Sequence, residues 1–118
     1  MTAQHHPTVA QVEATEAHAL VLSDQALLLD VREHHEWHAG HAPMALHVPL
    51  GELTVRHEVL PSDRAIVVVC RSGQRSQLAA QALVAAGYDA ANLAGGMQRW
   101  VASGLPVEAA GGGPGVVA

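Results

Sequence analysis

The chain has 118 residues, 49% of them hydrophobic and 14% charged, a composition that fits one compact domain and excludes a disordered chain. Its formal net charge is −5 and it contains no lysine, so it lacks the clustered cations with which proteins bind nucleic acids or anionic membranes. A single cysteine excludes an internal disulfide, and no apolar run is long enough to span a bilayer. Since the first residues also lack the features of a signal peptide, the sequence predicts a cytoplasmic protein.

Strand-like and helix-like segments alternate along the chain. Short apolar runs predict strands at residues 9–13, 26–31, 46–48, 65–69 and 88–93. The stretches between and after them predict helices at residues 15–22, 33–39, 51–59, 74–86 and 97–103. This order predicts a three-layer α/β domain, with a central parallel sheet of about five strands flanked by helices.

The domain is expected to cover residues 9–108. Residues 1–8 are expected to form a flexible N-terminal arm and the glycine-rich residues 109–118 a flexible tail, because ordering such segments costs more entropy than their contacts return. Within the domain, an apolar stripe that includes Leu78 and Leu83 is predicted to pack the fourth helix on the sheet.

The stretch Cys70-Arg71-Ser72-Gly73-Gln74-Arg75-Ser76 lies between a buried strand and a helix. A tight turn from a strand into a helix N-terminus directs backbone N–H groups toward one point, where an anion is stabilised. Cys70 stands at this point beside Arg71 and Arg75, so its thiol is predicted to ionise more easily than a free cysteine, whose pKa is about 8.5. The residues therefore predict a nucleophilic thiolate in an anion-binding loop.

A lone cysteine at the end of a strand is often only a small buried apolar residue. Two guanidinium groups on a polar turn would be poor neighbours for an inert core residue, so a functional role is the better interpretation. The residues alone leave the reaction open, because a cysteine followed by an arginine in such a loop serves both sulfur transfer and phosphate-ester hydrolysis.

This loop resembles the active-site loop of single-domain rhodaneses, the thiosulfate-type sulfurtransferases. Other stretches that resemble signatures of that family are Leu27-Leu28-Leu29-Asp30-Val31-Arg32-Glu33, Gly40-His41-Ala42-Pro43, Val48-Pro49-Leu50, Asn92-Leu93-Ala94-Gly95-Gly96-Met97 with Trp100, and Gly104-Leu105-Pro106-Val107. They occur in the family's order and with its usual spacing over nearly the whole chain, so the match is more specific than a loop alone would be.

The resemblance implies a rhodanese-like fold and transfer of a sulfane sulfur from thiosulfate or a similar donor to cyanide or a thiol, through a Cys70 persulfide. Cys70 would be the catalytic residue, and the substrate-binding residues would be Arg71, Ser72, Gly73, Gln74, Arg75 and Ser76. A sulfur-accepting protein is a further expected partner, and no metal or organic cofactor is expected. A rhodanese-like phosphatase and a non-catalytic binding or regulatory module remain as alternatives.

Four histidines gather around the predicted helix at residues 33–39, namely His34, His35, His38 and His41. His34 and His38 share one helical face, a spacing that metal sites use. No cysteine is free to join them, and the neighbouring acids Glu33 and Glu36 are expected at the surface. We therefore predict no metal site here.

Three nearby residues carry smaller predictions. Asp30 ends a strand and is interpreted as structural, since such a carboxylate usually pairs with an arginine or accepts backbone N–H bonds. Trp37 is expected to anchor the core. Met44 stands where the family usually has a glycine, and a side chain there restricts positive φ, so the turn is expected to depart from the family's geometry.

Overall fold

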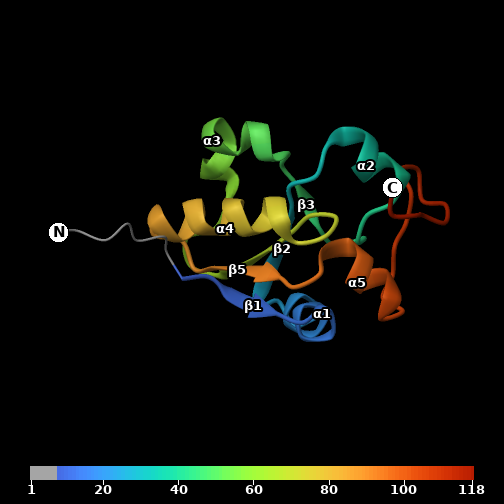
Figure 1. Ribbon diagram of the computed structural model, residues 1–118, viewed down its shortest axis with the longest axis horizontal. Helices are drawn as coiled ribbons and strands as arrows, with labels where there is room; N and C mark the ends of the chain where they lie inside the picture. The colour runs from blue at the N-terminus through green and yellow to red at the C-terminus, as the bar shows by residue number, and fades with distance from the viewer. Residues whose placement is uncertain (1–7) are drawn as a thin grey trace.

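The computed structural model describes residues 8–118, so residues 1–7 of the predicted N-terminal arm lie outside the described part. Within it, five parallel strands form one sheet in the order β1-β5-β4-β2-β3 (Figure 1). The strands are β1 (Ala10–Val12), β2 (Ala26–Asp30), β3 (Leu46–His47), β4 (Ala65–Val69) and β5 (Ala90–Leu93). The predicted three-layer α/β fold with a central parallel sheet is confirmed.

Helices cover both faces of the sheet, with α3 and α4 on one side and α1 and α5 on the other (Figure 1). The helices are α1 (Ala14–Leu22), α2 (His34–Ala39), α3 (Leu53–Arg56), α4 (Gln74–Ala85) and α5 (Gly96–Ala102). Helix α2 follows β2 and lies beyond the carboxyl ends of the strands, close to the start of α4. Within residues 8–118, no helix combines the length and the hydropathy that crossing a membrane would require.

The helix predicted over residues 51–59 is broken in the structure. A single 3-10 turn lies on either side of the short α3, at Leu50–Glu52 and His57–Val59. This segment contains a glycine and two β-branched valines, which are weak helix formers, and of residues 51–59 only Leu53 is buried. Too few tertiary contacts are available to hold a continuous helix together.

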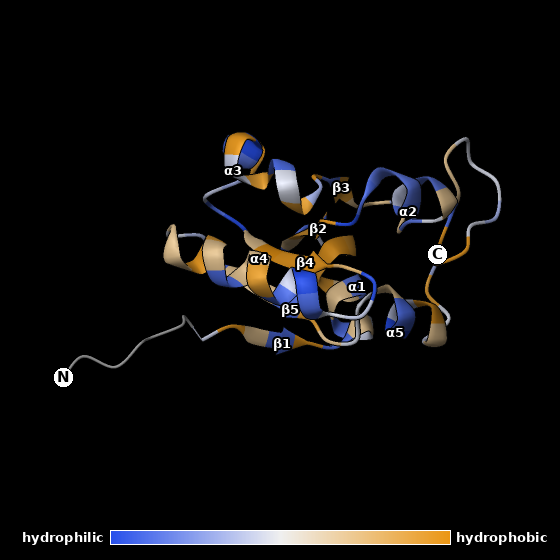
Figure 2. Cartoon of the chain, turned by 45° about the horizontal axis from the view of Figure 1, so that its top comes forward, coloured by the Kyte–Doolittle hydropathy of each residue, from blue (hydrophilic) through white to orange (hydrophobic). Residues whose placement is uncertain are grey.

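Each face of the sheet has its own hydrophobic core. Ile66 and Val68 point into one core and Val67 and Val69 into the other, because alternate residues of a strand face opposite sides. The second core also contains Trp100, which is completely buried. Figure 2 shows β2 and β4 as hydrophobic, in keeping with central strands that are covered on both faces.

Helix α4 packs on the sheet through a different stripe from the predicted one. Its buried residues are Ser76, Ala79, Ala80 and Leu83. Leu78, which was predicted to face the sheet, is 62% exposed. It lines a shallow apolar groove between α3 and α4 instead. The helix takes this rotation because Ser76, in its first turn, faces Cys70.

The C-terminal residues 109–118, which are expected to form a flexible tail, make backbone contacts with the rest of the domain. They lie beside α2 (Figure 1), where the N–H of Val116 donates a hydrogen bond of 2.9 Å to the carbonyl of Ala39. A Cβ on Gly40 would lie 2.3 Å from the carbonyl oxygen of Val116, so the glycine that ends α2 permits this close approach. Backbone contacts of this kind leave no signal in composition.

Candidate active site

Cys70 directly follows β4 and is almost fully buried, with 1% of its surface exposed. The chain turns at Gly73, whose φ of 105° lies in the left-handed region that favours glycine, and α4 begins at the next residue. This turn brings two donors to the sulfur. The N–H of Gly73 donates to Cys70 Sγ over 3.1 Å, and the hydroxyl of Ser76 does so over 3.2 Å.

The surroundings of Cys70 favour its thiolate. Burial opposes ionisation, but the pKa of Cys70 is nevertheless lowered from its ordinary value. The lowering comes from hydrogen bonds donated by the Ser76 hydroxyl and by the backbone N–H groups of Ser76, Gly73 and Ser72. The sequence interpretation assigned this effect to two arginines as well as to the helix N-terminus, but the groups that contact the sulfur are a hydroxyl and the main chain.

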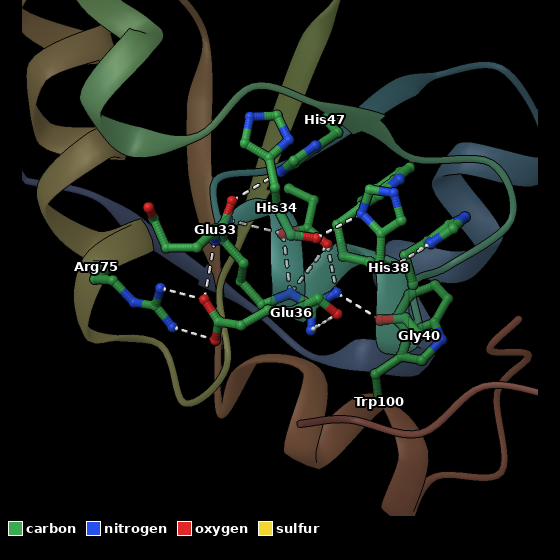
Figure 3. Close-up of polar contacts among 12 residues, drawn as sticks. Glu33, His34, Glu36, His38, Gly40, His47, Arg75 and Trp100 are labelled. Atoms are coloured by element: carbon green, nitrogen blue, oxygen red, sulfur yellow. Dashed lines mark hydrogen bonds and ion pairs between the residues drawn. The ribbon is translucent and has the colours of Figure 1, made fainter. Parts of the chain in front are cut away.

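Arg75 is paired with a carboxylate from another helix. Its Nη1 and Nη2 atoms donate hydrogen bonds of 2.7 and 2.8 Å to the two carboxylate oxygens of Glu36 (Figure 3). The guanidinium lowers the pKa of Glu36 to about 2. Glu36 is 7% exposed, so the prediction that it lies at the surface is wrong. The error arose because its partner is 39 residues away in the sequence.

Glu36 also fixes the start of its own helix. Its carboxylate accepts a hydrogen bond of 2.9 Å from the N–H of Glu33, and the side chain of Glu33 caps a backbone N–H of α2 in return. One carboxylate therefore links α2 to the first turn of α4, directly after the cysteine loop (Figure 3).

The remaining predicted substrate-binding residues lie at the mouth of the loop. Ser72 and Gln74 are exposed. Arg71 is exposed as well, and its Nε donates a hydrogen bond of 2.9 Å to the carbonyl oxygen of Ala118. Of the two arginines, Arg71 is therefore the one whose guanidinium makes no ion pair with an aspartate or glutamate side chain among residues 8–118.

The start of α5 supports the loop from behind. The N–H groups of Met97 and Gln98 donate hydrogen bonds of 2.8 and 3.0 Å to the carbonyls of Cys70 and Arg71. A Cβ on Gly96 would lie 2.5 Å from both of these carbonyl oxygens, closer than atoms can approach. Glycine is therefore needed at residue 96 for contact with the loop as well as for its positive φ of 61°.

Asp30 and Arg32 form a fully buried ion pair at the end of β2, with Arg32 Nη2 and Asp30 Oδ2 separated by 2.8 Å. The same Nη2 atom donates to the carbonyl of Gly40 over 2.7 Å. The structural interpretation of Asp30 is confirmed, and Arg32 holds the end of α2 to the strand from the interior of the protein.

Comparison with known proteins identifies the family. The model of the rhodanese-like domain matches residues 13–103. The chain belongs to this family.

A sulfurtransferase of Allochromatium vinosum is 39% identical over 88 residues, which cover 74% of this chain and 82% of that protein. The thiosulfate sulfurtransferase GlpE of Vibrio cholerae is 31% identical over 99 residues, which cover 83% of this chain and 93% of that protein. Among solved structures, a rhodanese-related protein of Thermoplasma volcanium matches with a TM-score of 0.78 and 28% identity, over 83% of this chain and 96% of that one.

Two of the four histidines considered as metal ligands, His34 and His38, contact other protein groups of this rhodanese-like domain. His38 Nδ1 lies 2.8 Å from the carbonyl of His34, and His34 Nε2 lies 3.2 Å from Glu52 Oε2. Across residues 8–118, no group of three or more histidine, cysteine or acidic side chains is arranged to hold a metal ion. Trp37 is only half-buried and is stacked between His41 and His47, so its predicted role as a core anchor is wrong.

Met44 lies in a turn closed by a hydrogen bond of 3.1 Å from the N–H of Ala45 to the carbonyl of Ala42. Among the non-glycine residues of the described part, only Asp24 has a positive φ. Met44 therefore avoids the left-handed backbone that a glycine would permit.

Proposed function

We propose that this rhodanese-like domain is a sulfurtransferase that moves a sulfane sulfur from thiosulfate, or a similar donor, to cyanide or a thiol. The observation that carries the proposal is the placement of Cys70 Sγ, which accepts hydrogen bonds from both the Gly73 N–H and the Ser76 hydroxyl. These donors lower the pKa of the thiol and so favour the thiolate, which is the nucleophilic form of cysteine.

The reaction has two displacements. In the first, the Cys70 thiolate attacks the outer sulfur of thiosulfate, the S–S bond breaks, and sulfite leaves with the electron pair. In the second, cyanide or a thiolate attacks the outer sulfur of the Cys70 persulfide, and the Cys70 thiolate leaves and is ready for another cycle. On the enzyme and on the departing sulfite, the negative charge lies on sulfur or oxygen, so hydrogen-bond donors are sufficient to stabilise it and no metal or organic cofactor is required.

The loop residues divide this work between main chain and side chains. The N–H groups of Ser72, Gly73 and Ser76 hold the charged sulfur, first as the thiolate and then as the persulfide. Arg71 meets the sulfonate end of thiosulfate, because it is exposed and pairs with no aspartate or glutamate side chain in the described part of the chain. Arg75 contributes positive charge near the loop while its guanidinium is paired with Glu36.

The physiological acceptor is proposed to be a small thiol or a sulfur-accepting protein in the cytoplasm. The chain holds one cysteine, so the persulfide sulfur has to leave to another molecule. A Bacillus subtilis relative named as a putative sulfur carrier protein, YrkF, is 39% identical over 80 residues, although the match covers only 43% of that protein. The name of this relative supports a sulfur-accepting protein as one of the two proposed kinds of acceptor.

Intact-mass measurement tests the proposal directly. The reduced protein, incubated with thiosulfate and freed of small molecules, should gain the mass of one sulfur atom. Cyanide should then remove that mass and release thiocyanate. The Cys70→Ser variant should show neither change. If the wild type gains no sulfur, or the variant forms thiocyanate as fast as the wild type, the proposal is wrong.

A further inference from the structure

Asn92, on β5, contacts two of the residues that donate hydrogen bonds to the Cys70 sulfur, Gly73 and Ser76. Its Oδ1 accepts a hydrogen bond of 2.6 Å from the hydroxyl of Ser76, and its Nδ2 donates one of 3.2 Å to the carbonyl of Gly73. Asn92 is 4% exposed. One buried amide on a neighbouring strand therefore holds both Gly73 and Ser76.

The orientation of this amide is fixed by a further chain of hydrogen bonds. Asn92 Nδ2 also donates to Gln11 Oε1 over 2.9 Å, and Gln11 Nε2 donates to Gln77 Oε1 over 2.7 Å. The two acceptors, on Gly73 and Gln11, both require the NH2 side of the amide, so its oxygen faces Ser76. A buried amide that is satisfied on both sides has one favourable orientation, since turning it over would leave polar groups unpaired.

The geometry at Ser76 suits a sulfur that gains and loses charge. Ser76 has one hydroxyl hydrogen, and its oxygen lies within reach of both Asn92 Oδ1 and Cys70 Sγ. When the sulfur becomes a thiolate, that hydrogen can turn from Asn92 to the sulfur while every heavy atom stays in place. Donors that need no reorganisation stabilise a developing charge most effectively.

We propose that Asn92 is a positioning residue of the sulfur site, which holds the left-handed Gly73 and the Ser76 hydroxyl where their donors reach Cys70. As a role in catalysis, this inference rests on the sulfurtransferase function proposed above. The effect of Asn92 on the ionisation of the Cys70 thiol can be tested without that function. Asn92 itself does not contact the sulfur in the structure, so it acts through its two partners.

The test is a double-mutant cycle on thiol reactivity. The rate of Cys70 alkylation by iodoacetamide is measured against pH for the wild type, Asn92→Leu, Ser76→Ala and the double variant. Asn92→Leu keeps the volume of the side chain and removes both hydrogen bonds. We expect its alkylation profile to move to higher pH and its rate at pH 7 to fall about tenfold, the effect of weakening a hydrogen bond to a charged group.

Asn92 acts partly through Ser76. Adding Ser76→Ala to the Asn92→Leu variant should therefore lower the alkylation rate by clearly less than Ser76→Ala lowers it in the wild type. Gln77→Ala is the matched control, since it removes the outermost bond of the same chain and should leave the profile unchanged. If Asn92→Leu does not fold, Asn92→Ala replaces it in the cycle. Thermal unfolding shows whether each variant is folded at the temperature of the alkylation measurement.

Additive effects of Asn92→Leu and Ser76→Ala would overturn the proposal, and so would an Asn92 variant that is less stable but has an unchanged alkylation profile. A profile that moves to lower pH would also overturn it, because Asn92 would then only compete with the sulfur for the Ser76 hydrogen. Iodoacetamide needs no sulfur donor, so these outcomes remain separate from the failure of thiosulfate to load the protein.

Discussion

The guanidinium of Arg75 and the carboxylate of Glu36 join two helices through a pair of hydrogen bonds of 2.7 and 2.8 Å. This pair lies directly behind the cysteine loop, because Arg75 is in the first turn of α4. The pKa of Glu36 falls from 4.5 to about 2 as a result, so the folded protein holds this carboxylate ionised more strongly than the unfolded chain does.

The ion pair predicts loss of stability in acid. A carboxyl group with a depressed folded pKa stabilises the protein fully above its unfolded value, and the contribution disappears as pH falls from about 4.5 toward 2. Glu36→Gln should therefore lower the free energy of unfolding by about 2 kcal/mol at pH 7, since Arg75 loses its partner in a half-buried position. Urea unfolding at several pH values measures the difference.

That difference between Glu36→Gln and the wild type should shrink steadily below pH 4.5. Glu58→Gln, a change at an exposed glutamate, is the control and should have almost no effect. An equal loss at pH 7 and pH 3 in Glu36→Gln would mean that packing, and not the ion pair, accounts for the destabilisation.

Ser76→Ala should raise the pKa of Cys70. The Ser76 hydroxyl is the foremost of the hydrogen-bond donors that lower this pKa, and an alanine leaves the thiolate with the backbone donors alone. The alkylation profile should therefore shift by about one pH unit, as expected for one hydrogen bond to a charged group. Arg71→Ala should shift it less, because Arg71 is exposed. A larger shift in Arg71→Ala would restore the arginine as the main cause.

The sequence was sufficient to predict the sheet, most helices and the cysteine loop, because each depends on residues that are adjacent in the chain. The apolar strands and the glycine turn carry their own local signals. Glu36 and Asn92 gave no such signal, since they reach the loop from other elements and are 39 and 16 residues from their partners in it. The ion pair of Arg75 gave no local signal for the same reason, because its partner Glu36 lies on another helix.

Gly96→Ala should impair the site more than it impairs the fold. Its Cβ would press on the carbonyl oxygens of Cys70 and Arg71, which lie 2.5 Å away, and the loop would have to move. We expect thiocyanate formation from thiosulfate and cyanide to fall at least about tenfold, since donors act only within hydrogen-bond range of the sulfur.

Gly104→Ala is the matched control for this change. Gly104 also has a positive φ, of 75°, but nothing lies within 4 Å of a Cβ placed there. Both variants therefore carry a backbone strain of about 1 kcal/mol, and only Gly96→Ala should lose activity. Equal activity losses in the two variants would show that strain alone is responsible.

The histidines near α2 are predicted to be dispensable for turnover. His34 and His38 are exposed and contact Glu52 and a backbone carbonyl, respectively. The double change His34→Ala with His38→Ala should leave thiocyanate formation nearly unchanged, and so should treatment of the wild type with a chelator. Loss of activity on chelation that returns with added zinc would instead establish a metal site.

Loop size is predicted to exclude phosphatase activity. Four residues separate Cys70 from Arg75, whereas rhodanese-like phosphatases, which resemble this loop, have one residue more and so a wider cradle for a tetrahedral phosphate. In this chain the donors converge on a single sulfur, with Gly73 N and Ser76 Oγ at 3.1 and 3.2 Å from it. Ser76 occupies the position where the longer loop would place its arginine. We therefore expect no appreciable hydrolysis of aryl phosphates by the native protein.

Inserting one glycine between Gly73 and Gln74 lengthens the loop and tests whether sulfur transfer requires the native loop length. The insertion should displace the first turn of α4, and with it the Ser76 hydroxyl and the Arg75 ion pair, so thiosulfate turnover should fall at least about tenfold. Thermal unfolding shows whether the loss is local. If the unmodified protein hydrolyses aryl phosphates as fast as it transfers sulfur, and Cys70→Ser abolishes that hydrolysis, then loop size does not determine which reaction this site performs.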